Sequence, residues 1–231
     1  MCIIAVCTKR KLTDDEIMSC FESNDDGAGM SWHANGMNYY SKGYSDPFMF
    51  AESYANVDVL PHVVHFRIGT SGGLGLSMTH PFVASTQSPI NFEWHGKAPL
   101  LFHNGIIRDW KELMVGTLPE LVRRKIKLPG GQWSDSRAAA FLVAILGEGV
   151  LSLMDGKFVY VAPDGDITRY GNFIEEKGVW YSNYTYKRLV SLKTSLATRA
   201  DLPALPTTYQ PYLGPLGKTA TGGEWDDYPV A

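Results

Sequence analysis

The sequence predicts an α+β protein in which antiparallel sheets carry helices on their faces. Short apolar segments with strand character recur along the chain, and only a few segments have helical spacing. Strands and helices do not alternate regularly, so a doubly wound parallel sheet is not expected. The chain has 231 residues, 45% of them hydrophobic. This length suits one large domain or two small ones with a sizeable core.

Local signals place the individual elements. Residues 1–8 form a largely apolar run that is followed by charged residues, which predicts a buried strand. A helix is expected after Thr13, because Thr13 and Glu16 have the spacing of a capping box. The clearest helix lies at 134–149, with a serine or an aspartate to cap it and an Ala- and Leu-rich interior. The other expected elements are a strand-rich stretch around Gly36 and Gly43, a short helix at 46–58, strands within 59–73 and 98–107, a helical segment at 109–125, a hairpin at 157–170 and a strand at 178–186; residues 79–94 read as a loop.

Composition excludes several classes of function. The net charge is −3 and the pI is near 6.1, so no basic excess supports binding to nucleic acid or to an anionic membrane. The chain contains no apolar run long enough for a transmembrane helix, and basic residues follow the first apolar run rather than precede it, unlike a signal peptide. A cytoplasmic protein is therefore expected. Three cysteines without a CxxC pair predict neither a disulfide framework nor a metal site, and no cofactor is expected.

The composition changes near residue 196. Residues 196–231 are rich in proline and glycine and show neither helical nor strand periodicity. We therefore expect one domain at 1–195 and a mostly extended tail at 196–231. Aromatic residues within the tail favour packing of part of it on the domain or on a partner.

Cys2 allows two interpretations. Cysteine is often a small buried hydrophobe in a strand, and for Cys7 on the same strand this interpretation is sufficient. If Met1 is removed, however, Cys2 carries both a thiol and a free α-amine. An amine with an ordinary pKa near 8 can accept the thiol proton, so this one residue would supply both nucleophile and base.

Three further motifs contain groups suited to amide chemistry. The stretch HFRIGTSGG at 65–73 places an arginine beside a glycine-rich turn, where its donors can bind a carboxylate. The Asn-Gly pair within FHNGII at 102–107 is typical of a hairpin turn, but it can also form an oxyanion hole. The stretch SDSR at 134–137 has residues that cap helices, and its carboxylate could instead hold an ammonium group. Each motif alone is unspecific.

Taken in order, the motifs resemble those of the class II glutamine amidotransferases, which belong to the N-terminal nucleophile hydrolases. The resemblance covers residues 2–190 and implies a four-layer αββα sandwich of two antiparallel sheets. The motifs that carry it are MCIIAV, NDDGAGMSW, HFRIGTSGG, a His-Pro pair, FHNGII, SDS before a helix, and the late strand GVWYSN.

The resemblance implies three catalytic positions. The family's N-terminal cysteine nucleophile falls on Cys2, whose α-amine would move the proton once Met1 is removed. The family's oxyanion hole falls on Asn104 and Gly105. A γ-glutamyl thioester on Cys2 would form and then be hydrolysed.

The resemblance also implies three residues that bind substrate. Arg67 matches the arginine that holds the α-carboxylate of glutamine, and Asp135 matches the acid that binds its α-ammonium. Thr70 matches a position that helps to seat the substrate. These opposite charges suit the two charged groups of an amino acid, and a substrate without them would leave both side chains unpaired.

Other positions are expected to shape the site without taking part in the chemistry. Asp26 and Gly27 match a turn that lies beside the nucleophile strand, and His80 matches a His-Pro that is structural or closes a loop. His65 and His103 lie on apolar strands and are interpreted as core residues.

The expected activity is hydrolysis of the side-chain amide of L-glutamine to glutamate and ammonia. Because the sequence contains no phosphate-loop motif GxxxxGK[ST], the ammonia is expected to pass to a separate acceptor synthetase. One alternative is an amidohydrolase of the same mechanism that acts on a γ-glutamyl peptide or another amide. A second alternative is an inactive relative that serves as a binding or assembly subunit. A homo-oligomer is left open.

Overall fold

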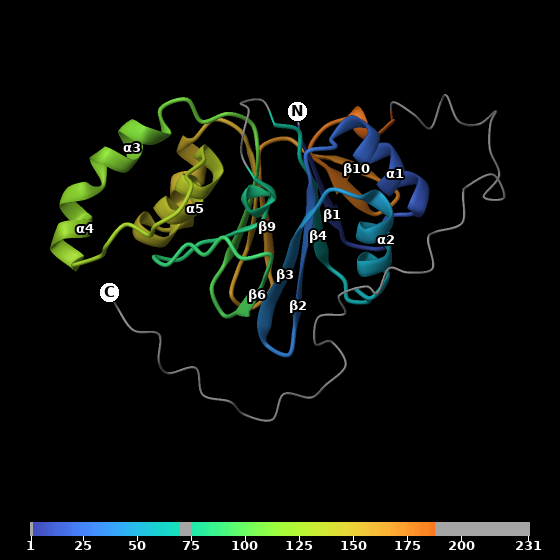
Figure 1. The fold of residues 1–231 in the computed structure, drawn as a ribbon, viewed down its shortest axis with the longest axis horizontal. Helices are drawn as coiled ribbons and strands as arrows, with labels where there is room; N and C mark the ends of the chain where they lie inside the picture. The colour runs from blue at the N-terminus through green and yellow to red at the C-terminus, as the bar shows by residue number, and fades with distance from the viewer. Residues whose placement is uncertain (1, 70–74, 188–231) are drawn as a thin grey trace. The chain divides into compact units, whose positions relative to one another are not determined.

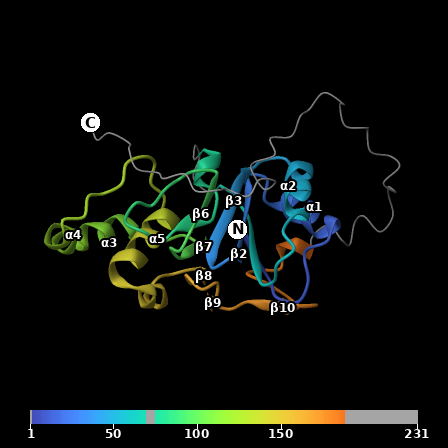
Figure 2. The same ribbon diagram turned by 90° about the horizontal axis from the view of Figure 1, so that it is seen from below.

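The computed structural model describes residues 2–69 and 75–187, and these residues form a four-layer αββα sandwich. Figure 1 shows two sheets side by side, with helices α1 (Asp14–Ser23) and α2 (Pro47–Ala55) on the outer face of one and α5 (Asp135–Leu146) on the outer face of the other. The same order of layers is seen after a 90° turn (Figure 2). The predicted α+β class and αββα layering are thereby confirmed.

The larger sheet contains the N-terminal strand near its centre. All of its neighbouring strands are antiparallel, and their order is β10-β11-β1-β4-β2-β3-β6. The bounds are β1 Ile3–Cys7, β2 Ala28–Ala34, β3 Met37–Tyr44, β4 His62–Phe66, β6 Glu93–Gly96, β10 Ile174–Glu176 and β11 Val179–Tyr181. Strand β1 is buried along its whole length, because β4 and β11 flank its edges while its two faces pack against the helices and against the opposite sheet.

The smaller sheet has the antiparallel order β5-β7-β8-β9. Its strands are β5 Phe82–Val83, β7 Leu100–Asn104, β8 Lys157–Val161 and β9 Ile167–Tyr170. Strands β8 and β9 form the predicted hairpin around the Pro-Asp-Gly turn. Strand β7 ends at Asn104, and the later strand that pairs with it, β8, begins only at Lys157, so the Asn-Gly pair at 104–105 is not a two-residue hairpin turn.

The helices begin where the sequence places capping residues. Thr13 and Glu16 form the predicted capping box of α1. The Ser134 side chain accepts a hydrogen bond from the backbone N–H of Arg137 and so caps α5. The segment predicted as one helical stretch at 109–125 forms two short helices, α3 (Trp110–Gly116) and α4 (Leu118–Arg124), which meet at Thr117. The remaining helical turns are η1 Leu76–Met78, η2 Glu148–Leu153 and η3 Thr185–Lys187.

Three apolar clusters hold the layers together. One joins the larger sheet to α1 and α2, and it includes Cys7 and Cys20. A second joins the smaller sheet to α5. The third lies between the sheets and contains Ile4, Val63 and Phe102 among its members. The inner cluster is important for the site because it shows which side chains of β1, β4 and β7 face the opposite sheet.

None of the helices in the two described ranges is long and apolar enough to cross a membrane. The tail predicted at 196–231 lies outside the described residues.

Candidate functional site

Three of the predicted site residues lie at one end of the inter-sheet layer. Side chains alternate between the two faces of a strand. Ile4 belongs to the inner cluster, so Cys2, two residues earlier, belongs to the same face. The same argument places Arg67, directly after β4, on the face of Val63, and Asn104, the last residue of β7, on the face of Phe102.

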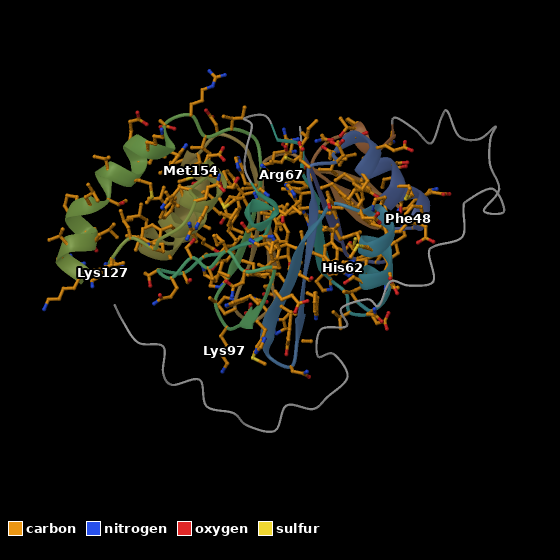
Figure 3. The ribbon with its side chains drawn as sticks, in the orientation of Figure 1. Phe48, His62, Arg67, Lys97, Lys127 and Met154 are labelled. Carbon is orange, nitrogen blue, oxygen red and sulfur yellow. The ribbon has the colours of Figure 1, made fainter. Side chains whose placement is uncertain are left out.

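Cys2 and Arg67 are brought together by strand pairing. Ile3 pairs with Phe66 in the antiparallel register of β1 and β4, so Cys2 and Arg67 follow at the same end of the two strands. The Cys2 thiol donates to the carbonyl oxygen of Ile68 at 3.6 Å. Figure 3 shows Arg67 at one end of β4, with His62 toward the other end.

The turn at Asp26 and Gly27 supports the arginine. The backbone N–H of Asp26 donates to the Arg67 carbonyl at 3.0 Å, and the Arg67 N–H donates to the Gly27 carbonyl at 2.8 Å. The Asp26 carboxylate accepts a hydrogen bond from the backbone N–H of Gly69. Gly27 has φ of 121°, and a Cβ there would lie 2.6 Å from a methyl group of Thr79. The sequence predicted that this turn lies beside the strand that follows Cys2. In the structure the turn contacts the loop that carries Arg67.

Asn104 lies at the end of β7 and is held through its side chain. It is 6% exposed, and its Nδ2 donates to Ser182 Oγ at 2.9 Å. Gly105 follows with φ of 155°. A Cβ at Gly105 would lie 2.9 Å from Gly156 Cα and 3.0 Å from His103 Nε2. Glycine is therefore required for the close approach of these two turns.

Asp135 is the first residue of α5, and both of its carboxylate oxygens accept backbone hydrogen bonds. Oδ2 accepts from Ile107 N–H at 3.0 Å, and Oδ1 accepts from Ser136 N–H at 2.8 Å. The first of these bonds joins Asp135 to the segment that follows the Asn-Gly pair. Ser136 Oγ lies 2.9 Å from His103 Nδ1, which joins α5 to β7 a second time.

Ser182 and Asn183 are site residues that sequence reasoning did not single out. They follow β11 directly. Ser182 Oγ accepts from Ile4 N–H at 2.9 Å as well as from Asn104, and Asn183 Nδ2 donates to the Cys2 carbonyl at 2.6 Å. The signals in the sequence were the motif GVWYSN, to which no site role was assigned, and the polar Ser-Asn pair at the end of its apolar strand.

The three histidines near the site are buried and held neutral. Burial lowers the pKa of His65 to about 3 and that of His103 to about 4, and it lowers the pKa of His80 well below its ordinary value. The rings of His65 and His80 lie 4.0 Å apart. These properties support the interpretation of all three as structural residues.

The surroundings of Cys2 do not by themselves activate its thiol. Burial raises the pKa of the Cys2 thiol above its ordinary value, and the positive charge of Arg67 acts in the opposite direction. A thiol with a raised pKa needs a base to become a nucleophile. The described residues contain no cluster of His, Cys, Asp and Glu suited to a metal. Thr70 lies outside the described residues.

Taken together, the site has a thiol at the start of a central strand, an arginine beside it, an Asn-Gly pair from the opposite sheet and a carboxylate at a helix N-terminus. A sandwich of two antiparallel sheets with this site at one end is the architecture of the N-terminal nucleophile hydrolases. The comparison with solved structures supports this fold.

Two solved structures share the fold. Glutamine phosphoribosylpyrophosphate amidotransferase from B. subtilis, in complex with ADP and GMP, matches with a TM-score of 0.52 and 15% identity over 78% of this chain and 41% of its own. A structure described as the allosteric regulatory enzyme of purine biosynthesis matches with a TM-score of 0.50 and 15% identity over 83% of this chain and 43% of its own. The chain thus spans about two fifths of the length of these enzymes. No protein-family model and no curated protein matches the sequence. The resemblance to class II glutamine amidotransferases is confirmed at the level of the fold.

Proposed function

We propose that this protein is a glutaminase of the class II amidotransferase type. The observation that carries the proposal is the convergence of Cys2, Arg67 and Asn104 on the inner faces of the two sheets at one end. Asp135 is connected to the same end through Ile107. The fold of the two similar structures supports the same class of activity.

In the proposed reaction, glutamine is held by its amino-acid head. Arg67 binds the α-carboxylate, and Asp135 binds the α-ammonium. The side-chain amide carbon is thereby placed beside the Cys2 sulfur, which supplies the proximity that speeds attack.

The chemical steps follow from the groups present. The Cys2 α-amine takes the thiol proton, and the sulfur attacks the amide carbon. The negative oxygen that develops accepts hydrogen bonds from Asn104 Nδ2 and from the Gly105 N–H. The C–N bond then breaks, and the proton is passed to the leaving ammonia. A thioester remains, and water hydrolyses it to glutamate and regenerates the thiol.

The ammonia is proposed to serve a separate acceptor enzyme. In this proposal the described αββα sandwich supplies only the glutaminase site, and a separate enzyme uses the ammonia. If this is correct, an acceptor assay with Cys2→Ala loses synthesis driven by glutamine and keeps synthesis driven by added ammonia. Loss of both would contradict ammonia transfer.

The test of the glutaminase itself uses a chain whose first residue is Cys2. We expect release of glutamate and ammonia from glutamine, with no release by Cys2→Ala and retained release by the matched core variant Cys7→Ala. Glutamine should also protect Cys2 from alkylation. Absence of both turnover and protection in the processed protein would refute the proposal. Preferred turnover of γ-glutamyl dipeptides over glutamine would indicate the related amidohydrolase instead.

A further inference from the structure

Ser182 lies where the two sheets meet at the proposed site. It directly follows β11 of the larger sheet and is 0% exposed. Its backbone N–H donates to the Ile4 carbonyl at 2.9 Å, and its Oγ accepts from the Ile4 N–H at 2.9 Å. Ser182 therefore satisfies both backbone groups of a residue on the nucleophile strand.

The same hydroxyl oxygen reaches the opposite sheet. Asn104 Nδ2, at the end of β7, donates to Ser182 Oγ at 2.9 Å. Lys157, which pairs with Asn104 in the register of β7 and β8, donates through Nζ to the Ser182 carbonyl. Two residues of the smaller sheet thus bind the residue that directly follows β11 of the larger sheet.

This contact fixes the orientation of the Asn104 amide. A side-chain amide nitrogen has two N–H groups. One of them is directed at Ser182 Oγ, so the amide plane is set and the second N–H is left to donate elsewhere. In an oxyanion hole that second N–H has to donate to the oxygen that becomes negative. The direction of the N–H determines how strong this hydrogen bond is.

The neighbouring residue extends the connection to the nucleophile itself. Asn183 Nδ2 donates to the Cys2 carbonyl at 2.6 Å, and Asn183 Oδ1 accepts from the backbone N–H and the hydroxyl of Thr185. The Ser182–Asn183 pair therefore contacts Cys2, Ile4 and Asn104.

We propose that Ser182 is a positioning residue that sets the Asn104 amide relative to the nucleophile strand. This inference rests on the proposed function, because it assigns to Ser182 the geometry of that reaction's oxyanion hole. Ser182 acts through Asn104 and need not touch substrate. Since the oxyanion forms only during the reaction, the loss of its support should lower kcat and leave KM nearly unchanged.

The experiment measures glutaminase kinetics of the chain that starts at Cys2. We expect Ser182→Ala to lower kcat by on the order of 10²-fold, comparable to the loss of one oxyanion donor, with KM within about threefold of the wild type. Ser182→Thr keeps the hydroxyl and should recover most of kcat. The matched control is Ser31→Ala, which removes another buried hydroxyl on β2 and should leave kcat unchanged.

A double-mutant cycle separates positioning from a general structural role. If Ser182 acts through Asn104, Ser182→Ala should have little further effect on kcat in an Asn104→Ala background. An equally large effect in that background would overturn the inference. A Ser182→Ala variant with a lower melting temperature but a normal kcat would overturn it as well.

A spectroscopic readout keeps this inference distinct from the proposed function. Absence of glutamine hydrolysis by the wild type and by all variants would refute the glutaminase, without deciding whether Ser182 holds Asn104. In ¹⁵N NMR spectra, Ser182→Ala should shift the Asn104 side-chain amide signals and speed their hydrogen exchange, whereas Ser31→Ala should not. Unchanged Asn104 signals in Ser182→Ala would overturn the positioning role whatever the activity.

Discussion

The carboxylate of Asp26 accepts a hydrogen bond from the backbone N–H of Gly69, 43 positions further along the chain. Gly69 lies two residues after Arg67, and the backbones of Asp26 and Gly27 are also paired with that of Arg67. The turn after α1 therefore holds the loop that carries the proposed carboxylate-binding residue. A change in this turn should therefore alter KM for glutamine more than kcat.

Asp26→Ala is expected to raise KM for glutamine by about tenfold while kcat changes little, because one charge-assisted hydrogen bond that orders the loop is lost. Steady-state kinetics of the processed protein measure both constants. Asp26→Asn keeps an acceptor oxygen and should recover much of the loss. The control is Asp25→Asn at the exposed neighbouring position, and an equal effect there would argue against the specific role of Asp26.

Arg67→Lys is expected to raise KM for glutamine by roughly ten- to a hundredfold, because a lysine keeps the charge but loses the paired donors of the guanidinium. Arg67 is only 7% exposed, so the replacement also changes a buried environment. Asp135→Asn should weaken binding of the α-ammonium similarly. Glutaramate lacks the α-ammonium group of glutamine. If Asp135 binds that group, Asp135→Asn and the wild type should have the same KM for glutaramate.

Much of the fold could be predicted because local signals agreed with the final structure. The capping box at Thr13, the cap of α5 at Ser134 and the Pro-Asp-Gly hairpin are all short-range patterns whose energetics depend on a few adjacent residues. The short strands β5, β6 and β10 were not predicted, because strands of two to four residues carry almost no periodic pattern. The prediction of a loop at 79–94 was wrong at β5 and at the start of β6.

The sequence predicted which residues form the site and their order along the chain, but not how they meet in space. Cys2, Arg67 and Asn104 are far apart in sequence, and their meeting depends on strand order and register. The contacts of Ser182 with Ile4 and Asn104 span 178 and 78 positions, so no local pattern could indicate them. Asn104 illustrates the same limit, since Asn-Gly is typical of a hairpin, whereas the strand that pairs with β7 after it begins only at Lys157.

The buried histidines predict loss of stability in mild acid. The pKa of His65 is lowered to about 3 and that of His103 to about 4, whereas in the unfolded chain both are near 6.5. Between these values the unfolded chain binds more protons, so the free energy of unfolding rises with pH. The free energy of unfolding is therefore unaffected by these histidines above about pH 6.5 and falls as the pH is lowered toward 4. The loss is roughly 3 kcal/mol for each histidine.

His80 should add to this loss, because burial lowers its pKa as well, and replacing it tests that contribution. Both of its ring nitrogens lack a hydrogen-bond partner among the described residues, and its ring packs against His65 and Phe82. Urea unfolding of His80→Leu between pH 4 and 8 should show a shallower fall on acidification than the wild type. The exposed variant His95→Gln should keep the wild-type slope, and an identical slope in all three proteins would contradict this assignment.

Arg137 predicts the largest loss of stability on a conservative change. It is 1% exposed on α5, and its guanidinium donates to the backbone carbonyls of Ser88, Gly130 and Gln132 at distances from 2.6 to 3.2 Å. The guanidinium also lies 4.7 Å from the ring of Trp133. One planar side chain thereby joins two loops to the helix that begins with Asp135.

A lysine cannot reproduce this fork of donors and leaves buried carbonyl groups without partners. We expect Arg137→Lys to lower the free energy of unfolding by about 3 kcal/mol or more, measured by urea denaturation at pH 7. The control Arg124→Lys, on the surface of α4 with a partner at Glu120, should stay within about 0.5 kcal/mol. Because the loop that contains Gly130 and Gln132 leads directly into Asp135, Arg137→Lys should also raise KM for glutamine at temperatures where it remains folded. A variant with full stability would show that the backbone carbonyls are satisfied without the guanidinium.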